Sequence, residues 1–247
     1  MGLKIVKGGD SWELPNNFHL TDAGFEKRME LTERAFSDGG INKGDDMIDI
    51  RSLKLEGELL ANSDGEYDSK WNELILKMTQ VEFYLEDGSW QILIAGAKRI
   101  DQTFDKSLRK RLGQIEIELV ASDPFWEHKD LSTKEESCPA PPEEFVVTND
   151  GSYVAYPVIT ITANANNPNM TLKNITDNNA IFSYIDSGFL ITKVLVVDCK
   201  KGTVKLDGTN TIRYFAGQFL RLLPGNNTIR YEGANATVKF EFYRRKL

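Results

Sequence analysis

The fold of this chain is indicated best by Gly217-Gln218-Phe219-Leu220-Arg221-Leu222-Leu223-Pro224-Gly225-Asn226-Asn227-Thr228-Ile229. Its Pro-Gly-Asn turn separates two short apolar runs, a pattern typical of strands joined by a tight turn. Upstream, the apolar run Val194 to Val197 is followed by Asp198-Cys199, a Lys-Lys-Gly turn and a second run from Thr203 to Leu206. The C-terminal part of the chain is therefore predicted to consist of antiparallel strands.

Size and composition indicate a globular protein. The chain has 247 residues, of which 40% are hydrophobic and 27% are charged, which is enough for two domains or for one large β domain. No run of about 18 apolar residues occurs, so no transmembrane segment is expected. Residues 1–8 contain no apolar core of signal-peptide length, so we expect synthesis and storage in a cytoplasm.

The net charge of −7 is unevenly distributed. Residues 1–137 contain 28 acidic and 18 basic side chains, whereas residues 138–247 contain 9 acidic and 12 basic ones. An acidic first part repels nucleic-acid backbones. The simplest interpretation of this charge is that it keeps the protein soluble.

The boundary between two domains is predicted in the segment Leu131 to Glu144, which is charged and contains three prolines within Pro139 to Pro142. Such a segment favours an extended spacer. We expect a linker at about residues 131–146, a first domain at 1–137 and a second domain at 138–247.

One helix is predicted in the first domain, at about residues 64–79. Ser63-Asp64-Gly65-Glu66 has the pattern of a capping box. A stripe of apolar residues follows at spacings of three and four, which predicts a buried helix face lying across a sheet. The residues of this stripe are Tyr67, Trp71, Leu74, Ile75 and Met78.

The rest of the first domain is predicted to be strands. Residues 1–46 indicate only short ones. The alternation of Ile48 and Ile50 changes phase before Leu53 and Leu55, which predicts a bulge near Arg51-Ser52. The remaining signals are a hairpin around Asp87-Gly88, with Val81, Phe83 and Leu85 before it and Trp90, Ile92 and Ile94 after it, and a strand through Ile115, Ile117 and Leu119.

In the second domain, turn signals recur along the chain, as expected for an antiparallel sandwich. The last strand is predicted to place Ala236, Val238, Phe240 and Phe242 on one face. Ile191 and the run Val194 to Val197 form a denser apolar stretch, for which we expect a central strand covered on both faces.

The order of these elements resembles the distal tail proteins of long-tailed, siphovirus-type bacteriophages or prophages, over roughly residues 45–247. The sharpest matches are Asp123-Pro124-Phe125-Trp126, at the end of the first domain, and Leu223-Pro224-Gly225-Asn226. The stretch Ser37 to Asp46 departs from the family pattern, whose members more often begin with a compact strand pair.

The resemblance implies a mainly β fold: an N-terminal β-rich, split-barrel-like domain with one short α-helix, then a C-terminal galectin-like antiparallel β-sandwich. It also implies a virion structural protein of the tail tip or baseplate, assembled in the host bacterial cytoplasm. Six copies would form a ring that connects the tail tube protein to the tail-tip hub. DNA would pass through the channel without specific binding, and no membrane partner is expected.

No catalytic, cofactor-binding or metal-binding residues are expected. Cys138 and Cys199 are widely separated and read as reduced thiols. His19 and His128 have no nucleophile signature beside them, and Gly39-Gly40 lacks the spacing of a phosphate-binding loop. The chain is therefore not expected to be an enzyme, although a tail-associated cell-wall hydrolase remains an alternative.

Two binding alternatives also remain open. The first is a virion carbohydrate-binding adhesin that uses the C-terminal sandwich; the four tryptophans all lie in the first domain, but the second retains tyrosines for stacking. The second concerns the basic cluster Lys106 to Arg111, which reads as a solvated turn or as a contact with an acidic neighbouring subunit.

Overall fold

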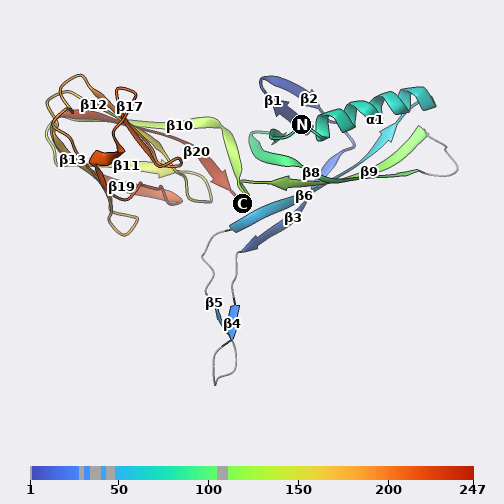
Figure 1. The fold of residues 1–247 in the computed structure, drawn as a ribbon, viewed down its shortest axis with the longest axis horizontal. Helices are drawn as coiled ribbons and strands as arrows, with labels where there is room; N and C mark the ends of the chain where they lie inside the picture. The colour runs from blue at the N-terminus through green and yellow to red at the C-terminus, as the bar shows by residue number, and fades with distance from the viewer. Residues whose placement is uncertain (1, 28–30, 34–39, 43–47, 105–110) are drawn as a thin grey trace. The chain divides into compact units, whose positions relative to one another are not determined.

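The computed structural model describes residues 2–27, 31–33, 40–42, 48–104 and 111–247 (Figure 1). The chain divides into two compact units, unit 1 from Met1 to Trp126 and unit 2 from Glu127 to Leu247. Both are built mainly of antiparallel strands, which confirms the predicted fold class. In the described part of the chain, no helix is long and apolar enough to cross a membrane.

Unit 1 is one antiparallel sheet with a helix on one face. The sheet continues from β3 through β6, β9, β8, β7 and β1 to β2. A separate pair is formed by β4 and β5. The elements are β1 (Lys4–Lys7), β2 (Asp10–Glu13), β3 (His19–Lys27), β4 (Leu31–Glu33), β5 (Gly40–Asn42), β6 (Ile48–Leu60), α1 (Asp64–Met78), β7 (Phe83–Asp87), β8 (Trp90–Phe104) and β9 (Leu112–Ala121).

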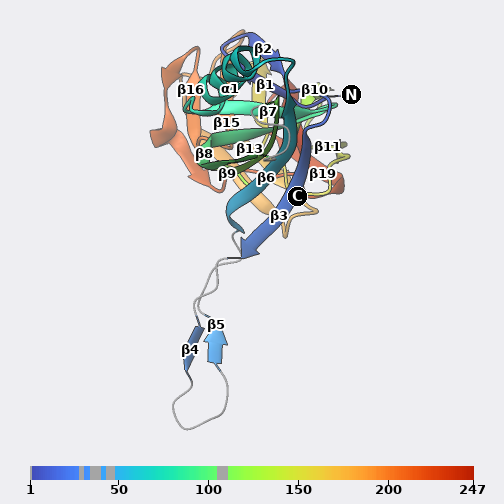
Figure 2. The same cartoon turned by 90° about the vertical axis from the view of Figure 1, so that its right-hand side faces the viewer.

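Helix α1 confirms the predicted capping box and the predicted apolar face. The Ser63 side chain accepts a hydrogen bond from the Glu66 amide, and the Glu66 carboxylate accepts one from the Asn62 amide. The first bond satisfies an amide that the first turn of a helix leaves unpaired, and the second holds the residue before the N-cap. Tyr67, Leu74 and Met78 are buried with the apolar face of the sheet, along which the helix lies (Figures 1 and 2).

The predicted bulge near Arg51 is present. The pairing of β3 with β6 shifts register on both sides of the Phe25–Arg51 pair. Arg51 lies two residues before Leu53, on the same buried face of β6, and is only 3% exposed. Its Nη1 donates a hydrogen bond of 2.9 Å to the Pro124 carbonyl, so this arginine fixes the Asp-Pro-Phe-Trp segment to the strand.

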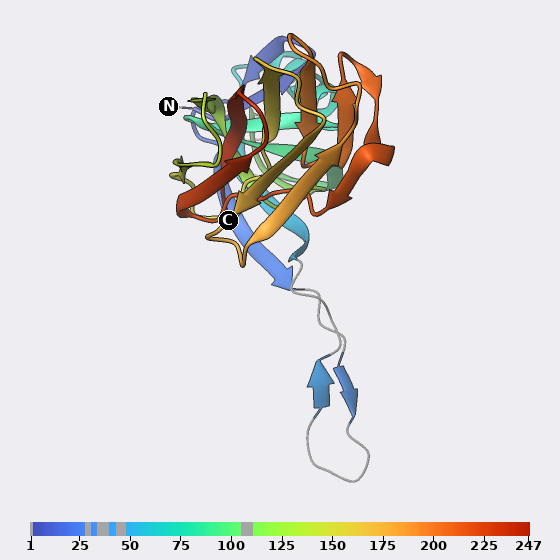
Figure 3. The same cartoon turned by 90° about the vertical axis from the view of Figure 1, so that its left-hand side faces the viewer.

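Unit 2 is a two-sheet sandwich (Figure 3). In this unit, one sheet has the order β17-β16-β15-β12-β20-β10 and the other has the order β11-β19-β13-β14-β18. The elements are β10 (Trp126–Cys138), β11 (Glu143–Asn149), β12 (Val158–Ala163), β13 (Asn169–Asn174), β14 (Ala180–Ile185), β15 (Val194–Asp198), β16 (Thr203–Leu206), β17 (Thr209–Asn210), the 3-10 helix η2 (Ile212–Tyr214), β18 (Phe215–Gly217), β19 (Gly225–Glu232) and β20 (Ala236–Lys246).

Every second residue of the strands points into the space between the two sheets and fills it. The last strand, β20, buries Ala236, Val238, Phe240 and Phe242 on one face, as predicted. The predicted central position of β15 is confirmed, but the predicted covering of both faces is wrong: its residues alternate between buried and half-buried, and Ile191, which precedes the strand, is 53% exposed. Although β15 lies between β12 and β16 in the sheet, only one of its faces is fully covered, as in other sandwiches.

The segment expected to be a linker contains regular structure. Strand β10 runs to Cys138, β11 begins at Glu143, and the compact units divide after Trp126 rather than near residue 138. The charges that suggested a spacer lie along β10, beside β20, where much of the strand is exposed to solvent. Lys134 and Glu136, for example, form an ion pair of 2.8 Å on this strand.

Both thiols are predicted to be unreactive in the folded protein. Burial raises the pKa of Cys138 to about 11 and that of Cys199 to about 12. Because the thiolate is the nucleophile, at pH 8 about one Cys138 thiol in a thousand is reactive, and fewer at Cys199. Ellman's reagent should detect no fast-reacting thiol natively and two in urea; rapid labelling of either thiol without denaturant would contradict the buried placement.

Candidate functional site

The sequence predicted no catalytic, cofactor-binding or metal-binding residues, and the described residues contain no group of three or more His, Cys, Asp or Glu side chains that could hold a metal ion. His19 lies 3.5 Å from a Glu56 oxygen in unit 1, whereas His128 contacts Arg244 in unit 2. The basic cluster falls mostly on residues 105–110, outside the described residues. Of its members, Arg111 is described, and its carbonyl accepts a hydrogen bond from the Ala61 amide.

The most distinctive surface of unit 1 is the face of the sheet opposite the buried one. In the central parts of β6 and β9, from Leu53 to Leu59 and from Ile115 to Leu119, the leucines and isoleucines are buried, and the residues between them point outward. Cross-strand register then places Glu56 beside Glu116, and Glu116 beside Asp101 on β8. We call these three residues the carboxylate row.

Like charges directly opposite one another destabilise a sheet, so the carboxylate row requires nearby cations. Lys54 Nζ lies 2.7 Å from a Glu56 oxygen and 3.0 Å from a Glu116 oxygen, and Arg99 Nε lies 2.6 Å from an Asp101 oxygen. Hydrogen bonding from Lys54 holds the pKa of Glu56 below its usual value, while Glu56 and Glu116 raise the pKa of Lys54. Lys54 therefore favours the ionised form of Glu56.

The surface around the row stays acidic after this pairing. Glu58 and Glu118 extend it on the neighbouring positions of β6 and β9, and Lys98 pairs with Glu118 at 2.8 Å. Five carboxylates thus face three cations. A hollow of about 380 Å³ lies over the row, and Asn17, His19, Thr103 and Gln114 contribute to its lining.

A free sheet edge lies beside this surface. Among the strands that the structure describes, β3 pairs only with β6, so its other side presents backbone groups without a strand partner. A nine-residue edge of this kind is a template for pairing with another chain. Unit 1 therefore combines an acidic face with an open edge.

In unit 2, buried asparagines hold the Leu223-Pro224-Gly225-Asn226 turn. Asn227 accepts a hydrogen bond from the Leu223 amide at 2.9 Å and donates to the carbonyls of Leu223 and Gly225 at 2.8 and 3.1 Å. Asn174 donates to the Arg221 carbonyl, and Asn149 donates to the Leu222 carbonyl. Sequence reasoning found the turn but not these three side chains, because a buried asparagine has no local pattern.

The comparisons with known proteins indicate a phage tail fold. Residues 150–245 match the family model described as the siphovirus-type tail component, C-terminal domain. The crystal structure of the Dit protein of phage SPP1, called a paradigm of the hub adsorption apparatus in phages that infect Gram-positive bacteria, is similar with a TM-score of 0.77 and 12% identity, covering 99% of both chains. A chain of the phage p2 baseplate gives a TM-score of 0.40 and 9% identity, covering 97% of each chain. No curated protein matches the chain in sequence.

The resemblance inferred from the element order is thereby confirmed. The strand that ends at Asp-Pro-Phe-Trp and the sandwich that contains the Leu-Pro-Gly-Asn turn lie in the predicted order. Residues 150–245 match the model of the siphovirus-type tail component, and the chain as a whole has a fold similar to that of the SPP1 Dit protein.

Proposed function

We propose that this chain is a structural component of a phage tail tip or baseplate, in which six copies close into a ring that connects the tail tube to the tail-tip hub. The observation that carries the proposal is the agreement of two findings: the family match of residues 150–245 and the whole-length similarity to the SPP1 Dit fold. The protein acts by geometry, without catalysis, in the virion tail, after assembly in the host cytoplasm.

The open edge of unit 1 supports a ring. Identical subunits close into a ring when each contributes two different surfaces that bind in a head-to-tail manner. Strand β3 offers one such surface through its backbone groups. Pairing or covering this edge by a neighbouring subunit leaves no exposed template for aggregation.

The carboxylate row supports a channel that DNA crosses without binding. Repeated in six copies, the row of Glu56, Asp101 and Glu116 gives a wall rich in carboxylates. Phosphates and carboxylates repel one another, so the wall keeps DNA from adhering during passage. Apart from other copies of itself, the partners of the protein are the tail tube protein and the tail-tip hub.

Light scattering combined with negative-stain images of the purified chain tests the ring. We expect six-fold rings, alone or after addition of tail tube or hub protein. A protein that stays monomeric with both partners present contradicts the proposal.

Replacing the carboxylate row with lysines (Glu56→Lys, Asp101→Lys and Glu116→Lys) is predicted to make the rings retain double-stranded DNA. The triple variant reverses the charge of the wall, so its DNA affinity at low salt should rise by at least about tenfold. The matched control is Glu135→Lys, Glu144→Lys and Asp150→Lys, which makes the same charge change on exposed positions of unit 2. Equal DNA retention by the two variants in a gel-shift titration would show that the carboxylate row does not line the channel.

A further inference from the structure

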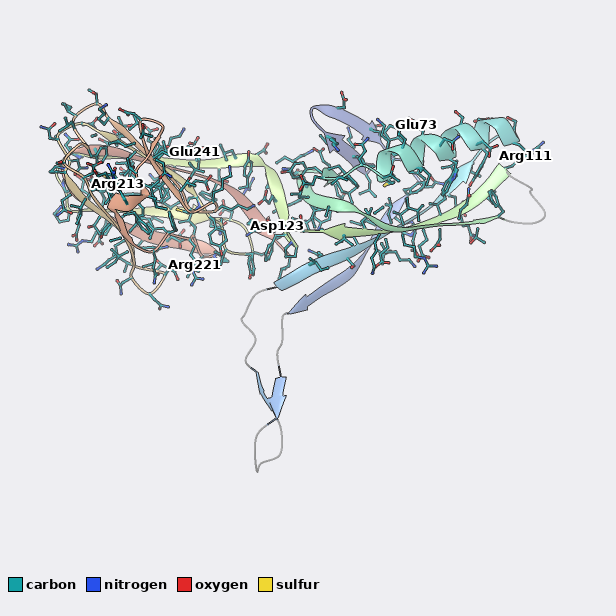
Figure 4. The ribbon with its side chains drawn as sticks, viewed as in Figure 1. Glu73, Arg111, Asp123, Arg213, Arg221 and Glu241 are labelled. Atoms are coloured by element: carbon teal, nitrogen blue, oxygen red, sulfur yellow. The ribbon has the colours of Figure 1, made fainter. Side chains whose placement is uncertain are left out.

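A cavity of about 660 Å³ opens on unit 2. One wall is the connection between β13 and β14, and another is the segment after β18, where Arg221 is labelled in Figure 4. Tyr156 borders a third side. The volume lies in the range of small-molecule sites, which are commonly lined by aromatic surface with a few polar groups. The residues on which the argument rests are Tyr156, Asp177, Asn178, Asn179, Gln218 and Arg221.

The charged groups of this cavity neutralise one another. Arg221 donates from Nε and Nη2 to the two carboxylate oxygens of Asp177 at 2.8 and 3.0 Å. Asp177 is 6% exposed, whereas 48% of the Arg221 side chain is exposed. The guanidinium is therefore held in one orientation, and its Nη1 group has no acceptor among the described residues. The cavity thus offers rigid donors but no net charge.

Three side-chain amides are placed at the rim by their backbone. Asn178 and Asn179 have φ angles of 49° and 59°, in the left-handed region that asparagine tolerates. Gln218 follows Gly217, whose φ is 101° and where a Cβ would lie 2.2 Å from the Ile181 carbonyl oxygen. Among the described residues, none of these amide side chains has a hydrogen-bond partner. Each can donate and accept at the cavity.

An aromatic ring completes the site. Tyr156 is 39% exposed, and its hydroxyl has no hydrogen-bond partner among the described residues. The Arg245 guanidinium lies 6.0 Å from the ring centre. A partly exposed tyrosine ring binds apolar C–H surface on its face and polar groups at its hydroxyl.

We propose that this cavity binds a neutral saccharide, with Tyr156 as the stacking surface and with Arg221, Asn178, Asn179 and Gln218 as hydrogen-bonding groups for its hydroxyls. Sugar hydroxyls both donate and accept, as amides do. A phosphate or carboxylate ligand gains little here, because Asp177 already neutralises Arg221. If the ring also forms, six such cavities per particle would add avidity at a glycan-coated surface.

The test uses the full chain on an array of neutral and of sialylated or sulfated oligosaccharides, followed by titration of the neutral oligosaccharide that binds best. Tyr156→Ala is expected to weaken binding about tenfold, and Tyr156→Phe less than about threefold. Asn179→Gly removes one amide at a φ that glycine adopts freely, and about fivefold weaker binding is expected.

Tyr243→Ala is the matched control. Tyr243 is 43% exposed, but it borders the neighbouring hollow and not this cavity, so its replacement should leave binding unchanged. Absence of binding to every neutral glycan overturns the proposal, as does a preference for anionic glycans. Undiminished binding by Tyr156→Ala overturns it too. Rings without glycan binding would refute only the proposal that the cavity binds a saccharide. Glycan binding without rings would refute only the proposal that six copies form a ring.

Discussion

Replacing Asn227 by leucine is expected to lower the free energy of unfolding of unit 2 by about 4 kcal/mol. The Asn227 side chain is 0% exposed and makes hydrogen bonds with the backbone of Leu223 and Gly225. It also accepts a hydrogen bond of 3.2 Å from the Asn174 amide. Leucine has similar volume but no polar atoms, so it leaves several buried groups without partners. Such groups cost about 1–3 kcal/mol each unless the structure relaxes.

Thermal unfolding of the full chain measures this effect. The transition of unit 2 should move down by about 15 °C, with the transition of unit 1 unchanged. Asn226→Ala is the matched control, because the neighbouring asparagine is exposed and accepts one exposed hydrogen bond, from Thr148. It should shift the transition by no more than about 2 °C. Equal shifts for the two variants would show that the asparagine network does not hold the turn.

Asn226 and Asn227 also show what local sequence does not reveal. The two residues are adjacent and identical in type, and the turn signal Pro224-Gly225 marks both equally. The alternation of β19 sends one side chain to solvent and the other into the core. Only the register of β19 with β11 and β13 decides which is buried, and register is a property of distant strands.

The features predicted correctly depend on short-range patterns. The capping box at Ser63 to Glu66 and the stripe through Tyr67, Leu74 and Met78 lie within a few turns of one helix. The linker was misplaced for the same reason: a charged segment with prolines looks like a spacer, and its place in a sheet beside β20 is not visible locally. Long-range pairing therefore accounts for the main correction.

The candidate sites required even more distant information. The carboxylate row joins Glu56, Asp101 and Glu116 from three strands, and each residue taken alone is an ordinary exposed acid. The cavity of unit 2 brings Tyr156 together with residues 177–179 and with Gln218 and Arg221. The tyrosines of the second domain were noted as possible stacking surfaces, but only the fold selects Tyr156 among them.

Gly113→Ala is expected to lower the free energy of unfolding of unit 1 by about 3 kcal/mol. A Cβ at this position would lie 1.9 Å from the Tyr67 hydroxyl oxygen and 2.8 Å from Cζ of the same ring. Tyr67 is 1% exposed under α1, and its hydroxyl accepts a hydrogen bond from Gln102. Because the ring is enclosed, the methyl group fits only if α1 moves away from the sheet. Chemical denaturation followed by tryptophan fluorescence measures the loss.

A double-mutant cycle with Tyr67→Phe separates this clash from other effects. Phenylalanine removes the oxygen nearest to the new methyl group, so Gly113→Ala should cost at least about 1 kcal/mol less in the Tyr67→Phe background. The control is Gly65→Ala, in the first turn of α1, where a new methyl group would meet nothing within 4 Å. There alanine should stabilise unit 1 by about 0.5 kcal/mol, since it favours the helix. If Gly113→Ala costs the same in both backgrounds, then α1 is not held against the sheet through Tyr67. The close approach of Tyr67 on α1 to Gly113 on β9 would then be wrong, because a tyrosine that reaches the backbone of that strand leaves no room for a side chain there.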